Sequence, residues 1–325
     1  LPLIGEWHCS SSSKKPMQYQ LPVDFVTTMR NLYGARGDIW CQNLTSHLAR
    51  LAAQWDLELG APFVLRYNYV CRAVQRQSGQ QVVLKTAPDN PDFHTEAAML
   101  RHYNGVGAIS LIAADAKNAA MLLSAADPGT RLLESGLNDS QQTHIAAQLM
   151  RASFQPPTQR APFPRIIDQA AVLTDLPARH PDAVRLIGAD HHTAALHILS
   201  QQDPGATALH GDLHHENILK HDAGWIIIDP KGVIGAPAAE CAAYLRNPGE
   251  LLDSGIDVVA LTVQRINIFA KILALPPQDI AAWNYALLVL SAWWCYEEAQ
   301  TIPAHVRANL HASARVAALL APRNA

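Results

Sequence analysis

The stretch from Thr207 to Gly232 constrains the fold of this chain more than any other part of its sequence. Two apolar runs, Ile218-Leu219 and Trp225 to Ile228, are separated by a short polar turn, which is the pattern of a β-hairpin. A hairpin brings its two ends close together. Asn217, just before the first strand, and Asp229, just after the second, are therefore predicted to lie side by side.

These residues carry the groups that phosphoryl transfer needs. An amide oxygen beside a carboxylate suits Mg²⁺, which prefers oxygen ligands and takes one or two of them from the protein. Asp212 precedes Asn217 on the same loop and is placed to accept a proton from a hydroxyl. The spacing matches His-x-Asp-x-x-x-x-Asn of kinase catalytic loops. We therefore expect Asp212 as the catalytic base, Asn217 and Asp229 as Mg²⁺ ligands, and ATP as the phosphoryl donor.

Two other interpretations of this stretch compete with the kinase-like site. Asp212 and Asn217 are also common turn residues, so the segment could be a polar loop between two core strands. His210, His214 and His215 could form a zinc cluster, but they lack cysteine partners and the His-Glu-x-x-His helix pattern. The full combination of motif, strand and second aspartate favours the kinase-like site.

The segment His-Gly-Asp-Leu-His-His-Glu-Asn-Ile (210–218), with Ile228-Asp229-Pro230, resembles the aminoglycoside phosphotransferase family. Leu-His-His-Glu, and Asp-Pro in place of Asp-Phe-Gly, resemble its branch of streptomycin 6-phosphotransferases and aminoglycoside/hydroxyurea antibiotic resistance kinases. The resemblance runs roughly from Phe63 to Trp294. It implies a protein-kinase-like bilobal α+β fold, with a small antiparallel-sheet N-lobe and a mostly helical C-lobe. It also implies ATP-dependent phosphorylation of a hydroxyl on a small cationic antibiotic such as streptomycin.

Charge and cysteine usage exclude several classes of partner. The net charge of −3 does not suggest a nucleic-acid surface, and no apolar run approaches the ~20 residues of a membrane span. The five cysteines are scattered singly, which fits a reduced compartment. We expect a cytoplasmic monomer that binds a small molecule and contacts neither nucleic acid nor membrane.

The N-terminal half is predicted to form a sheet with a nucleotide-binding lysine. The expected strands are residues 63–66, 69–75, 81–86, 109–114 and 119–125, which make a five-stranded antiparallel N-lobe, preceded by a helix capped by Asp38. Lys85 ends the third strand, and Glu96 follows in a helix from Phe93 to Tyr103. By its order along the chain, Lys85 is expected to hold the nucleotide phosphates and Glu96 to orient it. The turn at 66–69 should cover the phosphates but contains no glycine, so its phosphate-contacting residues cannot be named.

Residues 125–129, Ala-Ala-Asp-Pro-Gly, break the strand pattern and are expected to be the hinge between the lobes. The backbone near Ser124 and Ala126 is then expected to meet the adenine edge. The resulting division is an extension or misassigned start at 1–16 with Met17 as initiator, a nucleotide-binding N-lobe at 17–126, and a C-lobe at 127–325.

The C-lobe is expected to be helical and to carry the carboxylates that bind a cationic substrate. Helices are predicted from Ser140 to about 150, from Asp182 to about 201, and over 256–273, 277–300 and 305–320. Glu240 follows Asp229 on a helix that should begin beside the active site, and Glu297 lies late on the helix at 277–300. Both are candidate substrate ligands.

Two rival functions share the same fold. One is a kinase for a metabolite such as choline, fructosamine, a sugar or homoserine. The other is a pseudokinase that binds nucleotide without chemistry. Pseudokinases typically lose one of the essential groups, whereas Asp212, Asn217, Asp229 and Lys85 are all present here, which argues against the second rival.

Overall fold

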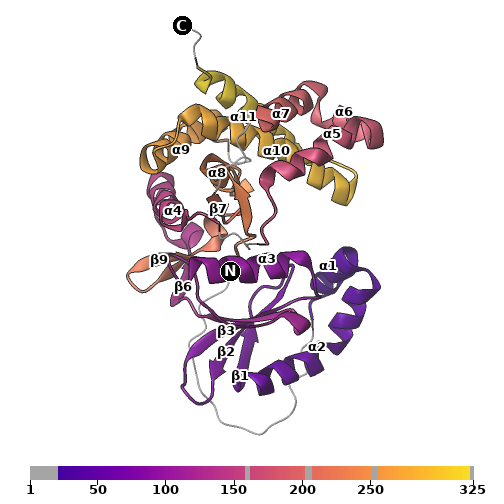
Figure 1. Ribbon diagram of the computed structural model, residues 1–325, viewed down its shortest axis with the longest axis vertical. Coiled ribbons are helices and arrows are strands. Elements are labelled where there is room, and N and C mark those ends of the chain that lie inside the picture. Colours follow the sequence, from indigo (N-terminus) through magenta and orange to yellow (C-terminus); the bar gives the residue numbers. More distant parts are fainter. Residues whose placement is uncertain (1–20, 158–161, 202–206, 250–254, 323–325) are drawn as a thin grey trace.

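The computed structural model describes residues 21–157, 162–201, 207–249 and 255–322. The chain has two parts, an N-terminal sheet with three helices and a larger, mostly helical C-terminal part (Figure 1). This is the α+β architecture that the sequence predicts. The expected extension at 1–16 and the initiator at Met17 lie outside the described residues.

The N-terminal part is built on a five-stranded antiparallel sheet, as predicted. Its strand order is β1-β2-β3-β5-β4. The strands are β1 (Leu57–Pro62), β2 (Tyr69–Gln75), β3 (Gln81–Thr86), β4 (Leu111–Asp115) and β5 (Ala120–Ser124). Leu84 and its even-numbered neighbours face α1 and α2, whereas Val83 and Lys85 face α3.

The prediction of a first strand at 63–66 is wrong. The strand ends at Pro62, and Leu57 rather than Phe63 is its buried anchor. Phe63 and Val64 suggested a strand by their apolar character, but they lie in the β1–β2 loop, where Val64 is 89% exposed. One bond continues beyond the strand, from the Phe63 amide to the Val70 carbonyl at 2.9 Å.

Two helices cover one face of the sheet, α1 (Val23–Tyr33) and α2 (Ala35–Gln54). Asp38 does not cap α2 as predicted, because the helix begins one turn earlier, after Gly34. Gly34 has φ 59°, which glycine tolerates and which lets the chain reverse between the helices. Asp38 instead pairs with Arg30 of α1 at 3.0 Å. Trp40 of α2 and Trp55 at its C-terminal end pack against the core of this layer.

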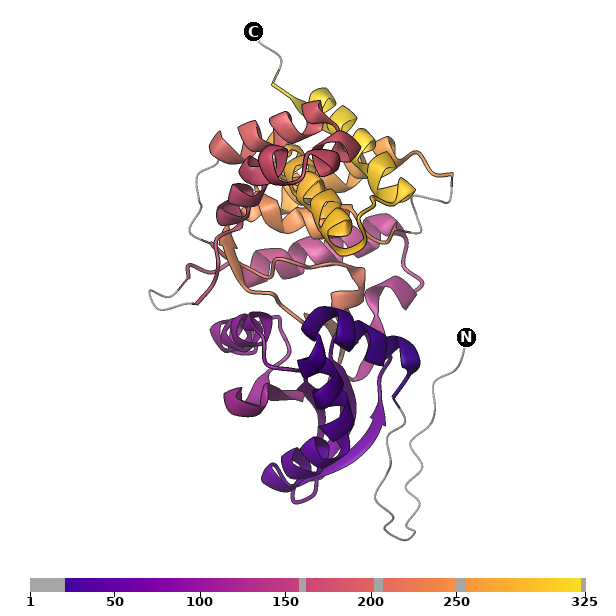
Figure 2. The same ribbon diagram turned by 90° about the vertical axis from the view of Figure 1, so that its right-hand side faces the viewer.

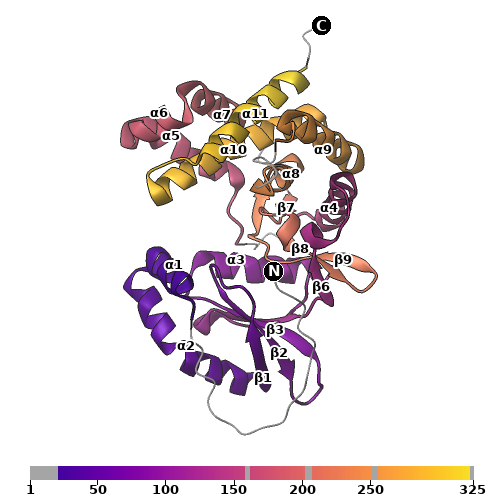
Figure 3. The ribbon, with the colours of Figure 1, turned by 180° about the vertical axis from the view of Figure 1, so that it is seen from behind.

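The opposite face of the sheet is covered by α3 (Pro91–Tyr103), which is capped by the Asn90 side chain. The predicted hairpin at 218–228 is present as β8 (Ile218–His221) and β9 (Gly224–Ile227), and β6 (Pro128–Arg131) completes its small sheet. This sheet lies against the N-terminal part (Figure 3). The Ile109 amide donates to the Ile227 carbonyl at 2.9 Å, so the two parts share a backbone hydrogen bond.

The C-terminal part is helical, as predicted, but two boundaries differ. Asn138, with a capping box to Gln141, starts the helix expected at Ser140, and the helix expected from Asp182 to 201 is broken at Gly188 with φ 100°. The helices are α4 (Asp139–Ser153), α5 (Ala170–Arg179), α6 (Pro181–Ile187), α7 (Ala189–Gln201), α8 (Pro237–Leu245), α9 (Val258–Leu273), α10 (Pro277–Ala299) and α11 (Ala304–Leu320).

One buried core joins α4, α8, α9 and α10 around Trp283, Tyr244 and Phe269. Among the described residues, no helix combines the length and the apolar character that crossing a membrane requires.

Candidate active site

The loop that carries the motif is held between two small sheets. β7 (Thr207–Leu209) pairs with β10 (Val233–Gly235) and delivers His210 into the loop, and η4 (His215–Asn217) leads into β8. The Ile228 amide donates to the Asn217 carbonyl at 3.0 Å, which confirms that the two ends of the hairpin lie together.

His210 is a buried structural residue that fixes this geometry. Its Nε2 donates to the Ile228 carbonyl at 2.8 Å, and its Nδ1 accepts from the Asp212 amide at 3.2 Å, so the ring is neutral. Burial lowers the pKa of His210 to about 4, which keeps it neutral at physiological pH. His210 therefore ties the loop before Asp212 to the strand before Asp229.

The other two histidines of the loop also have structural contacts. His215 stacks on Tyr244 with ring centroids 3.9 Å apart, and the His214 ring accepts from the Glu216 amide at 3.4 Å. In the described part of the chain, no group of three or more histidines, cysteines or carboxylates could hold a metal ion. The geometry thus gives the zinc interpretation no support.

Asp212 lies between two cations. Arg246, directly after α8, approaches Asp212 Oδ1 at 3.4 Å, and Lys231 approaches Oδ2 at 3.5 Å. Burial by itself raises the pKa of the Asp212 carboxyl, but the positive charges of Lys231 and Arg246 outweigh it and lower the pKa. The carboxylate is therefore ionised and able to orient a hydroxyl and accept its proton.

Lys85 and Glu96 form the pair that the sequence predicts. The Lys85 ammonium lies 2.7 and 2.8 Å from the two Glu96 oxygens, and both side chains are buried. Lys85 also lies 3.2 Å from Asp229 Oδ1. Burial alone lowers the pKa of Lys85, but the two carboxylates raise it overall, so the lysine is charged. Lys85 thus joins β3, α3 and the residue that follows the hairpin.

Asn217 and Asp229 provide oxygen atoms of the kind that Mg²⁺ prefers. The Asn217 amide nitrogen donates to the Asp212 carbonyl at 2.9 Å, which fixes the side chain; its amide oxygen can act only as an acceptor or a metal ligand. Asp229 has φ 57°, an unusual conformation for a residue other than glycine, and its side chain is 44% exposed. Two protein oxygens fit a cation that completes its coordination with phosphate and water oxygens.

The structure corrects the prediction for Glu240. This residue is 2% exposed, and its carboxylate accepts from the Gly211 amide at 3.2 and 3.4 Å. It therefore lies beneath the catalytic loop, where it cannot meet a substrate from solvent. The sequence predicted that α8 would begin beside the loop, but it did not predict that the Glu240 side chain would point into the protein.

The remaining predicted residues lie at the two edges of the region. The Ser124 amide donates to the Ser110 carbonyl at 2.9 Å and is already used within the sheet, and Ala126 lies half-buried just after β5. Glu297 is exposed near the end of α10. In all three views this end of the helix lies on the side of the C-terminal part that faces α1 (Figures 1, 2 and 3).

Comparison with known proteins identifies the family of this chain. Residues 66–299 match the family described as aminoglycoside/hydroxyurea antibiotic resistance kinase. The chain belongs to this family. It is therefore a small-molecule phosphotransferase with the protein-kinase-like fold.

Two relatives and one solved structure are similar to this chain over most of its length. Streptomycin 6-kinase of Streptomyces glaucescens is 25% identical over 284 residues, which cover 86% of this chain and 92% of that protein. Hydroxyurea phosphotransferase of Kitasatospora aureofaciens is 26% identical over 293 residues, with 86% and 82% covered. The solved structure of aminoglycoside phosphotransferase APH(4)-Ia with ADP and hygromycin B has a TM-score of 0.53 at 12% identity and covers 83% of this chain and 98% of that one.

Four cations near the catalytic loop were not predicted as site residues: Lys231, Arg246, Arg66 and Arg131. Lys231 lies two residues after Asp229 within residues 207–232, and this proximity was an available signal. Arg246 and Arg66 reach the loop from distant parts of the chain, at 3.4 Å from Asp212 and 3.5 Å from Glu216 respectively, and no sequence pattern announces either contact.

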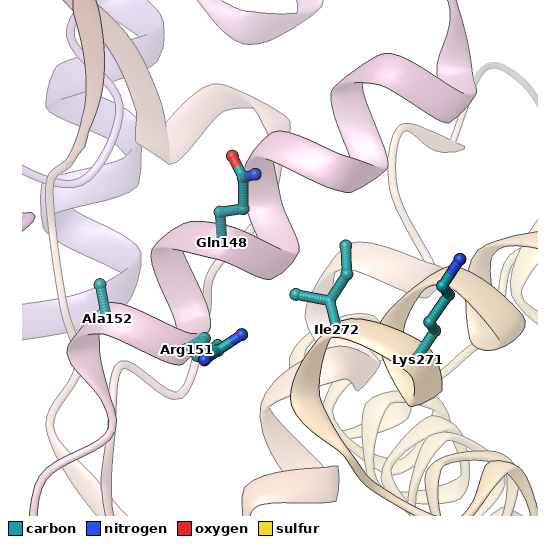
Figure 4. A pocket seen from close by; sticks show the side chains of 5 residues that line it. All are labelled: Gln148, Arg151, Ala152, Lys271 and Ile272. Carbon is teal, nitrogen blue, oxygen red and sulfur yellow. The ribbon is translucent and has the colours of Figure 1, made fainter.

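A pocket between α4 and α9 lies outside this region (Figure 4). Its volume is about 560 Å³, and it is lined by Gln148, Arg151, Ala152, Lys271 and Ile272. None of these residues belongs to the catalytic loop or to the Lys85 cluster, so the pocket is separate from the candidate active site.

Proposed function

We propose that the protein transfers the γ-phosphoryl group of ATP to a hydroxyl of a small cationic antibiotic, with streptomycin as the first candidate. One observation carries the proposal: Asp212, Asn217 and Asp229 converge with the Lys85–Glu96 pair. Similarity to the streptomycin 6-kinase over 86% of this chain supports the choice of substrate. In this proposal the nucleotide binds between the N-lobe, residues 17–126, and the C-lobe, residues 127–325.

Asp212 is the proposed base. Its carboxylate, held by Lys231 and Arg246, orients the acceptor hydroxyl and takes its proton as the bond to phosphorus forms. Because the two cations lower the pKa of Asp212, the carboxylate is ionised and can position the hydroxyl. Glu240 supports this role by fixing the Gly211 amide directly before the base.

Lys85, Asn217 and Asp229 are proposed to bind the nucleotide. Lys85, oriented by Glu96, contacts the phosphate oxygens, and Ala126 offers backbone groups to the adenine. Asn217 and Asp229 would hold Mg²⁺, which when bound neutralises the charge that accumulates on the phosphates. Lys85, Glu96 and Asn217 are fixed by contacts within the protein, so little reorganisation of these side chains accompanies the reaction.

Glu297 is the proposed carboxylate for the cationic substrate. It is exposed and lies on the next turn of α10 after Trp293, whose ring is 5.0 Å from that of His180. An exposed carboxylate suits a guanidinium or ammonium group.

The test is ADP release by the purified protein with streptomycin, hydroxyurea and choline as separate acceptors. We expect turnover with streptomycin, and we expect Asp212→Asn to lower kcat by about 10²–10⁴-fold while nucleotide affinity is kept. Turnover with hydroxyurea or choline alone would reassign the substrate. Nucleotide binding without turnover of any acceptor would identify a pseudokinase, and near-wild-type kcat in Asp212→Asn would remove the base assignment.

A further inference from the structure

The β1–β2 loop, residues 63–68, lies at the same end of the sheet as Lys85. The register that pairs Tyr69 with Thr86 and Val70 with Lys85 places the start of β2, and hence the loop, at that end. The loop has no glycine, so it lacks the close backbone approach by which glycine-rich loops bind phosphate. Its sequence, Phe-Val-Leu-Arg-Tyr-Asn, contains one charged residue, Arg66.

Arg66 reaches across to the catalytic loop. Its Nη1 lies 3.5 Å from Oε2 of Glu216, the residue directly before Asn217. Among the ion pairs of the described residues, only two join the N-terminal sheet region to the segment 207–232: Arg66 with Glu216, and Lys85 with Asp229. Arg66 therefore contacts the residue next to one proposed Mg²⁺ ligand, Asn217, and Lys85 contacts the other, Asp229, directly.

Glu216 does not depend on Arg66 for its charge balance. Arg131, at the end of β6, lies closer, with Nη1 3.0 Å from Oε1. The Arg66 side chain is 65% exposed, and exposed ion pairs of this length are weak. If Arg66 moves away, the Glu216 carboxylate therefore still has Arg131 as its partner.

We infer that Arg66 is the phosphate-contacting residue of the β1–β2 loop, and that it exchanges Glu216 for the terminal phosphates of the nucleotide. The inference rests on the proposed nucleotide site. A guanidinium binds a phosphate group through paired hydrogen bonds. The Glu216 carboxylate is shared with Arg131 and offers Arg66 only one of its oxygens. Arg66 and Lys85 would then hold the phosphates from two sides.

Other arginines of the same sheet have different partners. Arg76 pairs with Asp56 at 3.7 Å, within the N-terminal part, and Arg72 lies 4.6 Å from the centre of the Phe63 ring. Arg76 is about as exposed as Arg66, and neither partner of its ion pair belongs to the proposed site. Arg76→Met is therefore a matched control for Arg66→Met.

The test is the affinity of the full-length protein for adenosine, ADP and ATP with Mg²⁺, measured by titration calorimetry for wild type, Arg66→Met and Arg76→Met. We expect Arg66→Met to weaken ATP at least tenfold, ADP less, and adenosine not at all. Arg76→Met should match wild type for all three ligands. An equal loss for adenosine and ATP, or unchanged ATP affinity in Arg66→Met, would overturn the inference.

A third variant, Glu216→Gln, separates phosphate binding from a structural ion pair. If Arg66 acts on phosphate, Glu216→Gln should leave ATP affinity unchanged or improve it, because the competing charge is gone. If the Arg66–Glu216 pair only stabilises the loop, both variants should weaken ATP equally, which would refute the inference. A wild-type protein that binds no ATP would refute the proposed function as well, whereas normal binding by Arg66→Met refutes this inference alone.

Discussion

Replacing Glu240 with glutamine should change how the stability of the protein depends on pH. Glu240 is 2% exposed, and burial raises its pKa from 4.5 to about 7, although the amide of Gly211 donates to it. A carboxyl whose pKa is higher in the folded state than in the unfolded state favours folding most when it is protonated. Its stabilising effect is complete below pH 4.5 and is lost as the pH rises through about 7.

The magnitude follows from the two pKa values. The interval between 4.5 and about 7 corresponds to about 3 kcal/mol of unfolding free energy. Glutamine has nearly the same shape and does not titrate. The free energy of unfolding of Glu240→Gln, relative to wild type, should therefore increase by about 3 kcal/mol between pH 4 and pH 8. Carboxylates common to both proteins cancel in this difference.

The assay is urea unfolding of both proteins at several pH values, with Glu297→Gln as an exposed control. The control should stay within about 0.5 kcal/mol of wild type throughout. A constant difference between Glu240→Gln and wild type would show that Glu240 does not titrate in this range. A difference of opposite sign would show that the Gly211 amide outweighs burial and lowers the pKa, which would refute the reasoning.

Three further substitutions test the site. Asp229→Ala should weaken ATP with Mg²⁺ more than ATP without it, and equal losses in calorimetry would make Asp229 structural. Lys231→Met removes a charge that lowers the pKa of Asp212, so that pKa rises and the acid loss of kcat should begin at a higher pH; an unmoved profile would exclude the contact. Glu297→Gln should raise the KM for streptomycin about tenfold, as loss of a charge-assisted hydrogen bond requires, and leave the KM for ATP unchanged.

The parts of the fold that the sequence predicted well are those encoded by neighbouring residues. β2 and β3 begin and end where the pattern indicated, because alternating burial and a glycine turn are local signals. The catalytic loop is equally local, since the hairpin alone brings Asn217 to Asp229. The strand predicted at 63–66 was wrong because Phe63 and Val64, an apolar pair in an exposed loop, have the same local pattern as a strand.

What could not be predicted depends on contacts across the fold. Glu240 and Glu297 are both glutamates on helices, and only the packing of α8 buries the first beneath the loop. Arg246 and Arg66 are separated from their partners by 34 and 150 residues. A sequence pattern gives the type of such residues but not the direction in which their side chains point.

Two charged groups of the site, Lys85 and Glu216, each have a nearer and a farther partner of opposite sign. Lys85 lies 2.7 Å from buried Glu96 and 3.2 Å from the more exposed Asp229. Glu216 lies 3.0 Å from Arg131 and 3.5 Å from the more exposed Arg66. In each case, the outer partner is the one proposed to engage the nucleotide or its metal.

This arrangement explains how the site can be ordered before a ligand enters. Removing one partner of an isolated buried pair leaves an uncompensated charge, which costs about 3–5 kcal/mol. When Asp229 turns to a metal, Lys85 still keeps Glu96, and when Arg66 turns to phosphate, Glu216 still keeps Arg131. The outer partners are therefore free to change ligands at low cost while the inner pairs hold β3, α3, β6 and the catalytic loop in place. The affinity for nucleotide then reflects the new contacts that form, because few existing contacts must be lost to form them.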